Sequence, residues 1–173
     1  FRKQIAQRLK TLRDERKLSL DATAKLTGVS KAMLGQIERE ESSPSISKLW
    51  QIASGLEVSF SSFFATNPLL QHEQSAFPED SGMKVTTMFP FQHDTNIEVF
   101  SLHMADYHEQ ISPAHAIGVI EYVIVMEGEL ELFFDGEWTL LKQGEHVRFH
   151  ADQKHIYKAK TPSVRFQNII YYP

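Results

Sequence analysis

The chain has 173 residues, of which 42% are apolar, with 18 Lys and Arg against 22 Asp and Glu and no cysteine. This length accommodates one domain or two small ones, and the lack of cysteine excludes disulfides, thiolate nucleophiles and Cys-ligated zinc sites. The net charge of -4 conceals a split, because residues 1–64 carry 11 basic and 7 acidic side chains whereas residues 65–173 carry 7 and 15. We therefore expect two units of opposite charge with different partners.

The apolar runs of the sequence are too short to form a membrane-spanning segment. The longest dense run, Val119–Met126, is interrupted by Glu121 and is far shorter than the roughly 20 residues that span a bilayer. The residues that follow Phe1 do not have the pattern of a signal peptide. These features predict a cytoplasmic protein.

Apolar residues in the first part of the chain recur at steps of three and four, which is the period of short amphipathic helices. Ser19, Ser30 and Ser45 stand where helix N-caps are expected, and Gly28 and Gly55 stand where helices end or turn. We predict an all-α bundle. The periodic positions are Ile5, Leu9, Leu12, Leu26, Val29, Met33, Leu34, Ile37, Ile46, Leu49, Ile52, Ala53 and Leu56.

A linker is expected at residues 65–83, between a domain over residues 1–64 and a domain over residues 84–173. The linker segment contains two prolines, several polar residues and no sustained period. Short segments separated by turns follow it, which predicts an all-β barrel or sandwich. The predicted strands are Lys84–Phe89, Asn96–Ala105, Val119–Met126, Glu129–Phe134, Glu137–Leu141, His146–Phe149, His155–Ala159 and Val164–Tyr172.

The segment from Leu20 to Arg39 has the form helix, tight turn with glycine, helix. This arrangement places a second helix in the major groove of DNA. The residues SLDATAKLTGVSKAMLGQIERE, followed by SSPSISKLWQIASGL, resemble the helix-turn-helix of the XRE-type repressor family over about residues 3–64. The resemblance implies a DNA-binding module that acts on a double-stranded operator.

The resemblance implies specific DNA contacts for the second helix of the motif. Lys31, Ala32 and Gln36 would face base edges, where Lys donates to guanine, Ala touches the thymine methyl and Gln bonds adenine. The implied phosphate contacts are Ser30, Arg39, Ser42, Ser43 and Lys48.

Other positions of the motif have structural roles or depart from the family. Arg13 and Glu38 match family positions that form an ion pair between helices. Leu20 stands where many members have a phosphate-binding Gln. With a charge of only +4, one module should bind DNA weakly, so we expect a homodimer on a two-fold site.

The strand-rich half resembles the cupin superfamily over about residues 84–172, which implies a jelly-roll barrel. His115 lies six residues before Glu121, Gly128 follows Glu121, and His155 follows a Gly-Glu pair. The resemblance implies a divalent-metal site made by His115, Glu121 and His155, which suits zinc, iron, manganese or nickel. Ile117 occupies the position of a second family histidine, so a metal-free polar pocket is the alternative.

Strand alternation supports an inward direction for Glu121. Val119 and Val123 share its parity, and a carboxylate in an apolar row requires a metal or cationic partner. We expect Tyr157, Val119, Val123 and Ile117 to line an effector pocket. The residues on the other face of this strand are also apolar, so a second sheet, the helical module or another subunit should cover that face. These residues are Ile120, Tyr122, Ile124 and Met126.

The sequence thus predicts a multidomain α + β chain, with an all-α helix-turn-helix bundle and an all-β cupin (jelly-roll) barrel. The leading function is a transcriptional regulator, not an enzyme, whose barrel binds a small effector, for which we hypothesise an amino acid at the metal. The alternative is a metal-dependent oxygenase or isomerase with a DNA-binding module. A third hypothesis is a DNA-binding protein whose barrel only dimerises.

Overall fold

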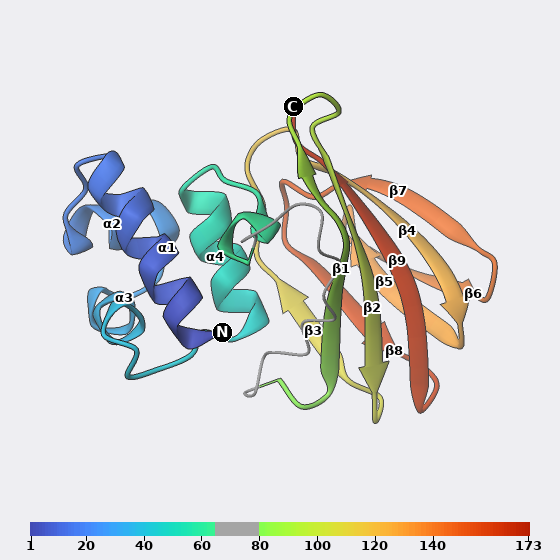
Figure 1. The fold of residues 1–173 in the computed structure, drawn as a ribbon. Coiled ribbons are helices and arrows are strands. Elements are labelled where there is room, and N and C mark those ends of the chain that lie inside the picture. Colours follow the sequence, from blue (N-terminus) through green and yellow to red (C-terminus); the bar gives the residue numbers. More distant parts are fainter. Residues whose placement is uncertain (65–79) are drawn as a thin grey trace.

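A computed structural model describes residues 1–64 and 80–173 of the chain (Figure 1). Helices form the first part and antiparallel strands the second. The helices are α1 (Arg2–Glu15), α2 (Leu20–Thr27), α3 (Lys31–Glu38), α4 (Ile46–Gly55) and the short 3-10 helix η1 (Phe60–Phe63). The strands are β1 (Met83–Gln92), β2 (Ile97–Ala105), β3 (Glu109–Ser112), β4 (Ile120–Glu127), β5 (Glu129–Phe134), β6 (Glu137–Lys142), β7 (His146–His150), β8 (His155–Ala159) and β9 (Ser163–Tyr171).

The predicted helix starts are confirmed by hydrogen bonds. Ser19, Ser30 and Ser45 each precede a helix, and each side-chain oxygen accepts a bond from the backbone N–H three residues later. Gly28 ends α2 at φ 69°, the left-handed conformation that glycine adopts without strain. The helix-turn-helix is therefore specified by local chemistry as well as by apolar spacing.

The strands form two antiparallel sheets, one with the order β1-β2-β9-β4-β7 and one with the order β3-β8-β5-β6. Each predicted strand is present in the structure with small changes at its ends. The strand Glu109–Ser112 was not predicted, and β1 extends to Gln92. Most of the predicted linker lies outside the described residues, although Met83 of that segment begins β1.

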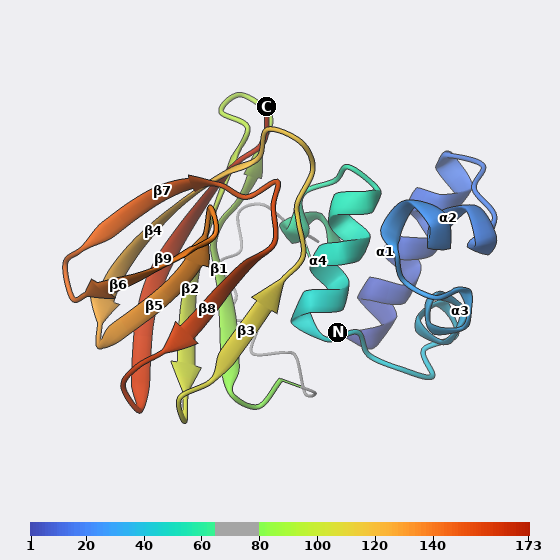
Figure 2. The same cartoon turned by 180° about the vertical axis from the view of Figure 1, so that it is seen from behind.

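Helix α4 lies between the other helices and the sheets (Figures 1 and 2). Its buried residues Ile46, Leu49 and Ile52 belong to an apolar core that continues into the sheets, where it includes Phe100 and Phe166. None of the described helices is both long enough and apolar enough to cross a membrane.

A buried carboxylate joins the end of the helical part to the first sheet. Both oxygens of Glu98 on β2 accept hydrogen bonds from backbone N–H groups of η1, at 3.1 Å from Phe60 and 3.0 Å from Ser61. The Tyr172 hydroxyl also donates to Glu98. Burial raises the pKa of the Glu98 carboxyl despite these three donors.

Candidate metal centre and DNA-reading helix

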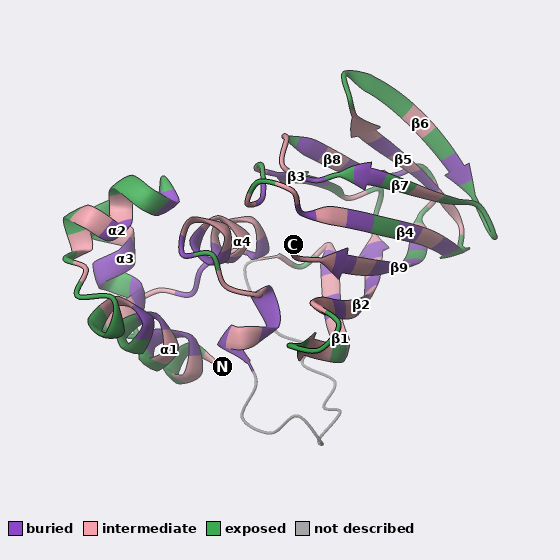
Figure 3. Ribbon diagram, turned by 90° about the horizontal axis from the view of Figure 1, so that it is seen from above, coloured by how far each residue is buried: buried purple, intermediate pink, exposed green. Residues whose placement is uncertain are grey.

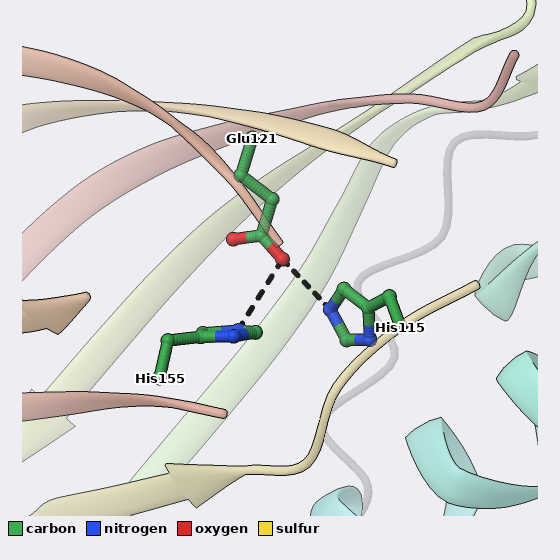
Figure 4. A group of neighbouring side chains, drawn as sticks. All are labelled: His115, Glu121 and His155. Atoms are coloured by element: carbon green, nitrogen blue, oxygen red, sulfur yellow. Dashed lines mark hydrogen bonds and ion pairs between the residues drawn. The ribbon is translucent and has the colours of Figure 1, made fainter. Parts of the chain in front are cut away.

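Three predicted metal ligands come together between the two sheets (Figure 4). Glu121 is on β4, His155 begins β8, and His115 lies in the segment between β3 and β4. All three are buried, and their candidate ligand atoms lie within 4.8 Å of one another. The arrangement of the two sheets has therefore brought residues separated by up to 40 positions to one point.

The tautomer of His155 follows from its surroundings. Its Nδ1 lies 2.9 Å from the Gln153 carbonyl oxygen, which can only accept, so Nδ1 carries the proton. Its Nε2 is buried without a hydrogen-bond partner and lies 3.5 Å from Oε1 of Glu121. Burial lowers the pKa of His155, which favours the neutral ring. A ring lone pair thus faces a carboxylate oxygen, an arrangement that a cation between the two atoms would stabilise.

The other face of Glu121 is held by two polar side chains. Its Oε2 accepts hydrogen bonds from Asn168 Nδ2 at 2.7 Å and from the Tyr157 hydroxyl. Oε1 lies 2.8 Å from His115 Nε2. Burial acts to raise the pKa of Glu121, but His155, His115 and the Tyr157 hydrogen bond outweigh it and lower the pKa to about 2. The carboxylate is therefore ionised and oriented with one oxygen toward both imidazoles.

The donor set fits a divalent cation. Two imidazole nitrogens and one carboxylate oxygen are a set used for zinc and for non-haem iron, with further coordination positions left for water or a ligand. The polar partners of Glu121 and His155 supply the outer-shell hydrogen bonds that ordinarily orient such ligands. A metal bound there would act as a Lewis acid and offer its open positions to a small molecule.

A cavity of about 10 Å³ adjoins two of the three predicted ligands, His115 and Glu121. Tyr157 lines this cavity, whereas Val119 and Val123, which were also predicted to line a pocket, are buried in the core and are not among the lining residues. The prediction for Ile117 is wrong, because Ile117 lies in a turn before β4 and its side chain is 90% exposed. The full lining is Ile46, Trp50, Met83, Val85, Phe100, Leu102, Gln110, Ser112, His115, Glu121, Tyr157 and Asn168.

Two contributors to the site, Asn168 and Trp50, escaped the sequence prediction. Asn168 shares the inward parity of Phe166 and Ile170 on β9, so a polar residue in that apolar row was a usable signal. Trp50 comes from α4 of the helical part, and no spacing in the sequence connects it with the cupin motifs. Only the packing of α4 on the sheets reveals its role.

Helix α3 presents the predicted base-reading residues to solvent. Lys31, Ala32 and Gln36 are exposed, whereas Leu34 and Ile37 are buried on the opposite side of the helix. The Lys31 Nζ pairs with Asp21 Oδ2 at 2.7 Å, and both side chains are more than half exposed. A pair of this kind contributes at most about 1 kcal/mol, so it holds the Lys31 side chain only weakly.

The predicted phosphate contacts differ in accessibility. Arg39 is exposed and pairs with Glu41, and Lys48 Nζ donates to Gln51 Oε1 at 2.8 Å. Ser30 caps α3, and Ser42 is half-buried. The prediction for Ser43 is wrong, because Ser43 is buried and its Oγ accepts a hydrogen bond from Arg2 Nε at 2.7 Å. Ser43 therefore anchors α1 instead of facing a phosphate.

The predicted ion pair between Arg13 and Glu38 is present. Arg13 Nε lies 2.7 Å from Oε1 and Nη2 lies 3.1 Å from Oε2, a bidentate geometry that links α1 to α3. The hydrogen bond to Glu38 raises the pKa of Arg13. Arg13 Nη1 also donates to the Leu18 carbonyl, which fixes the turn before α2.

Comparison with known proteins places this arrangement in a family. Residues 9–63 match the helix-turn-helix family and residues 105–166 match the cupin domain family. The HTH-type transcriptional regulator SutR of Escherichia coli K12 is 46% identical over 171 residues, which is 98% of this chain and 95% of SutR. The chain belongs to the helix-turn-helix transcriptional regulators that carry a cupin domain.

Solved structures agree with this membership. A crystal structure of an HTH_3-family transcriptional regulator from Vibrio cholerae is 58% identical, with a TM-score of 0.96, and the match covers all of this chain and 97% of that one. The cupin domain of an XRE-family regulator from Enterobacter cloacae is 38% identical with a TM-score of 0.52, over 53% of this chain and 98% of the other. The chain is thus a DNA-binding regulator with a cupin domain, as the sequence predicted.

Proposed function

We propose that this regulator binds a divalent metal ion through His115, Glu121 and His155, and that the metal site receives a small effector. The observation that carries the proposal is the buried Nε2 of His155, which has no hydrogen-bond partner and faces an ionised carboxylate. A free lone pair in this position costs free energy that a cation would recover. An amino acid is our candidate effector, because its amine and carboxylate can fill two open positions of the metal.

The DNA-binding part of the proposal assigns base contacts to α3. Lys31, Ala32 and Gln36 are its exposed residues, and they have the chemistry for guanine, thymine and adenine respectively. Exposed Arg39 and the half-buried Lys48 would contact phosphates beside the groove.

We propose that the regulator acts as a homodimer through the outer face of the five-stranded sheet. Phe89, Val99, Ile169 and Tyr122 are cross-strand partners and form an apolar row over β1, β2, β9 and β4. Phe89 is 55% exposed and Tyr122 is 38% exposed, and Figure 3 shows exposed segments on β1 and β4, the strands that carry them. A second copy that covers this row would also supply the second α3 helix that a two-fold operator needs.

The metal part of the proposal is tested by calorimetric titration of the metal-free full chain with Zn²⁺. We expect one Zn²⁺ ion per chain, and we expect His155→Ala to abolish this binding. His146→Ala is the matched control, because His146 is exposed on β7 and should leave binding unchanged. Equal Zn²⁺ binding by His155→Ala and the natural chain would contradict the proposed site.

A separate titration of the metal-loaded chain with each amino acid tests the effector class. Heat of binding for at least one amino acid is expected, and none for the same ligand with His155→Ala. No binding of any amino acid would exclude this effector class and leave the metal site itself standing.

A further inference from the structure

Helix α4 of the DNA-binding part contacts a metal ligand of the cupin part directly. Ser54 Oγ lies 3.3 Å from Nδ1 of His115, and the ring of Trp50 lies 4.7 Å from the His115 ring. Trp50 and Ile46 of the same helix also line the cavity beside the ligands. We propose that Ser54 and Trp50 are positioning residues for His115, so that the DNA-binding part completes the metal site and metal occupancy is coupled to DNA affinity. This inference rests on the metal site proposed above.

The hydrogen bond to Ser54 suits both states of His115. Without metal, the Nε2–H of His115 can donate to Glu121 Oε1 at 2.8 Å, and Nδ1 then accepts from the Ser54 hydroxyl. A metal bound through Nε2 would leave the ring proton on Nδ1, which would then donate to Ser54 Oγ. A hydroxyl both donates and accepts, so Ser54 can hold the ring in either tautomer.

The two histidines differ in the origin of this support. Nδ1 of His155 is held by the Gln153 carbonyl, which belongs to the cupin part itself. Nδ1 of His115 is held by a side chain of α4, on the DNA-binding part. The orientation of only one of the two imidazoles therefore depends on where α4 lies.

A neighbouring side of α4 packs closely against the helix-turn-helix. A Cβ atom on Gly55, the neighbour of Ser54, would lie 2.5 Å from both the Leu26 carbonyl oxygen and the Thr27 Cα. The end of α4 is thus in backbone contact with the end of α2, one residue before the Gly28 turn that leads to α3. A shift of α4 must be transmitted to this turn, because closely packed backbones have no free space to absorb it.

The size of the cavity makes such a shift necessary for effector binding. A volume of about 10 Å³ is close to the ~10–15 Å³ that one water needs. An ion or a water fits, but a ligand as large as an amino acid requires the wall made by Ile46 and Trp50 to withdraw. Effector binding would then move α4, the same helix that contacts the helix-turn-helix. The effector and the DNA would thus act on one shared structural element.

Two measurements on the metal-free full chain test the inference, with Co²⁺ as the probe. The first is Co²⁺ affinity with its visible absorption spectrum. The second is the ratio of DNA affinities with and without Co²⁺, measured on a duplex selected from random sequence by the natural chain. Ser54→Ala removes the hydroxyl, Ser54→Thr retains it, and Ser47→Ala is the control. Ser47 is on the same helix and donates to the Ile111 carbonyl at 3.0 Å without touching a metal ligand.

We expect Ser54→Ala to weaken Co²⁺ binding about 10- to 100-fold and to alter the Co²⁺ spectrum, as loss of an outer-shell partner typically does. In the natural chain Co²⁺ should change DNA affinity by about 5-fold or more, and this ratio should fall toward one in Ser54→Ala. Ser54→Thr should restore both properties, and Ser47→Ala should leave Co²⁺ affinity and spectrum unchanged.

Failure of the positioning role can be distinguished from failure of the proposed metal site. A natural chain that binds no Co²⁺ overturns both. Co²⁺ binding with the same affinity and spectrum in Ser54→Ala overturns the positioning role alone. An unchanged DNA-affinity ratio in a Ser54→Ala protein with weakened Co²⁺ binding overturns the coupling. Far-ultraviolet circular dichroism of each variant verifies that it is folded.

Discussion

Asn168 and Glu121 lie on adjacent strands, and the Asn168 amide donates to Glu121 Oε2 at 2.7 Å, on the side of the carboxylate away from the histidines. This bond leaves Oε1 directed toward His115 and His155. Asn168 is therefore a positioning residue for Glu121 at the proposed metal site.

Replacement of Asn168 should therefore weaken metal binding without removing a ligand. We expect Asn168→Ser to lower Zn²⁺ affinity about 10- to 100-fold, because Glu121 loses one of the two groups that fix its orientation. Gln167→Ser is the matched control on the same strand, since Gln167 has the opposite parity. Calorimetric titration measures both, and equal affinities for the two variants would show that Asn168 has no role at the site.

Substitutions on α3 should weaken specific DNA binding. Loss of a good base contact costs about 1–3 kcal/mol, so Lys31→Ala and Gln36→Ala should each reduce operator affinity roughly 5- to 150-fold and relax base preference. Lys142→Ala, on β6 of the cupin part, removes the same charge as Lys31→Ala and should have no effect. Fluorescence anisotropy with a selected duplex tests this, and an unchanged sequence preference in both α3 variants would exclude the assigned reading helix.

A charge in the apolar row of the five-stranded sheet should break the dimer. Tyr122→Glu places a carboxylate among Phe89, Val99 and Ile169, and its burial against a second copy would be unfavourable. Leu140→Glu, at an exposed apolar position on the other sheet, should remain dimeric. Sedimentation velocity at micromolar concentration measures the state. A dimer that persists in Tyr122→Glu would place the interface elsewhere.

The buried Glu98 carboxyl should make stability depend on pH. Its pKa is raised by burial in the folded protein, so protonation of Glu98 is more favourable in the folded protein than in the unfolded chain. Its stabilising contribution is complete below the unfolded pKa and is lost as pH rises through the raised folded pKa. The facing Tyr172 hydroxyl has a pKa raised well above its ordinary value and stays protonated over this range.

Glu98→Gln isolates this effect. Relative to Glu98→Gln, the natural chain should lose free energy of unfolding as pH increases from the acidic range toward neutrality. Urea unfolding at a series of pH values measures the difference. Parallel pH profiles for the two proteins would show that Glu98 has the same pKa in the folded and unfolded states.

Local signals in the sequence were sufficient for the helical part. The Ser19, Ser30 and Ser45 caps, the Gly28 turn and the Arg13–Glu38 pair all followed from residue type, spacing and family resemblance. Strand parity also gave the correct inward direction of Glu121, together with burial of Val119 and Val123. These features depend on near neighbours or on a regular period.

The features that the sequence did not predict depend on packing between residues far apart in the chain. Ile117 was assigned to the pocket by its place in a family motif, but a turn exposes it. Ser43 was assigned to DNA, but it is covered by α1 and bonded to Arg2. The contact of Ser54 and Trp50 with His115 joins two parts of the chain across more than 60 positions, and no local pattern encodes it.

We propose above that His115, Glu121 and His155 hold a metal ion. Anomalous diffraction from crystals of the Co²⁺-loaded full chain, measured on both sides of the cobalt absorption edge, tests it most directly. We predict one anomalous peak per chain, at about 2.0–2.2 Å from the two Nε2 atoms and one Glu121 oxygen. No peak at these three residues in a protein saturated with Co²⁺, or a peak only at surface histidines, would contradict the account.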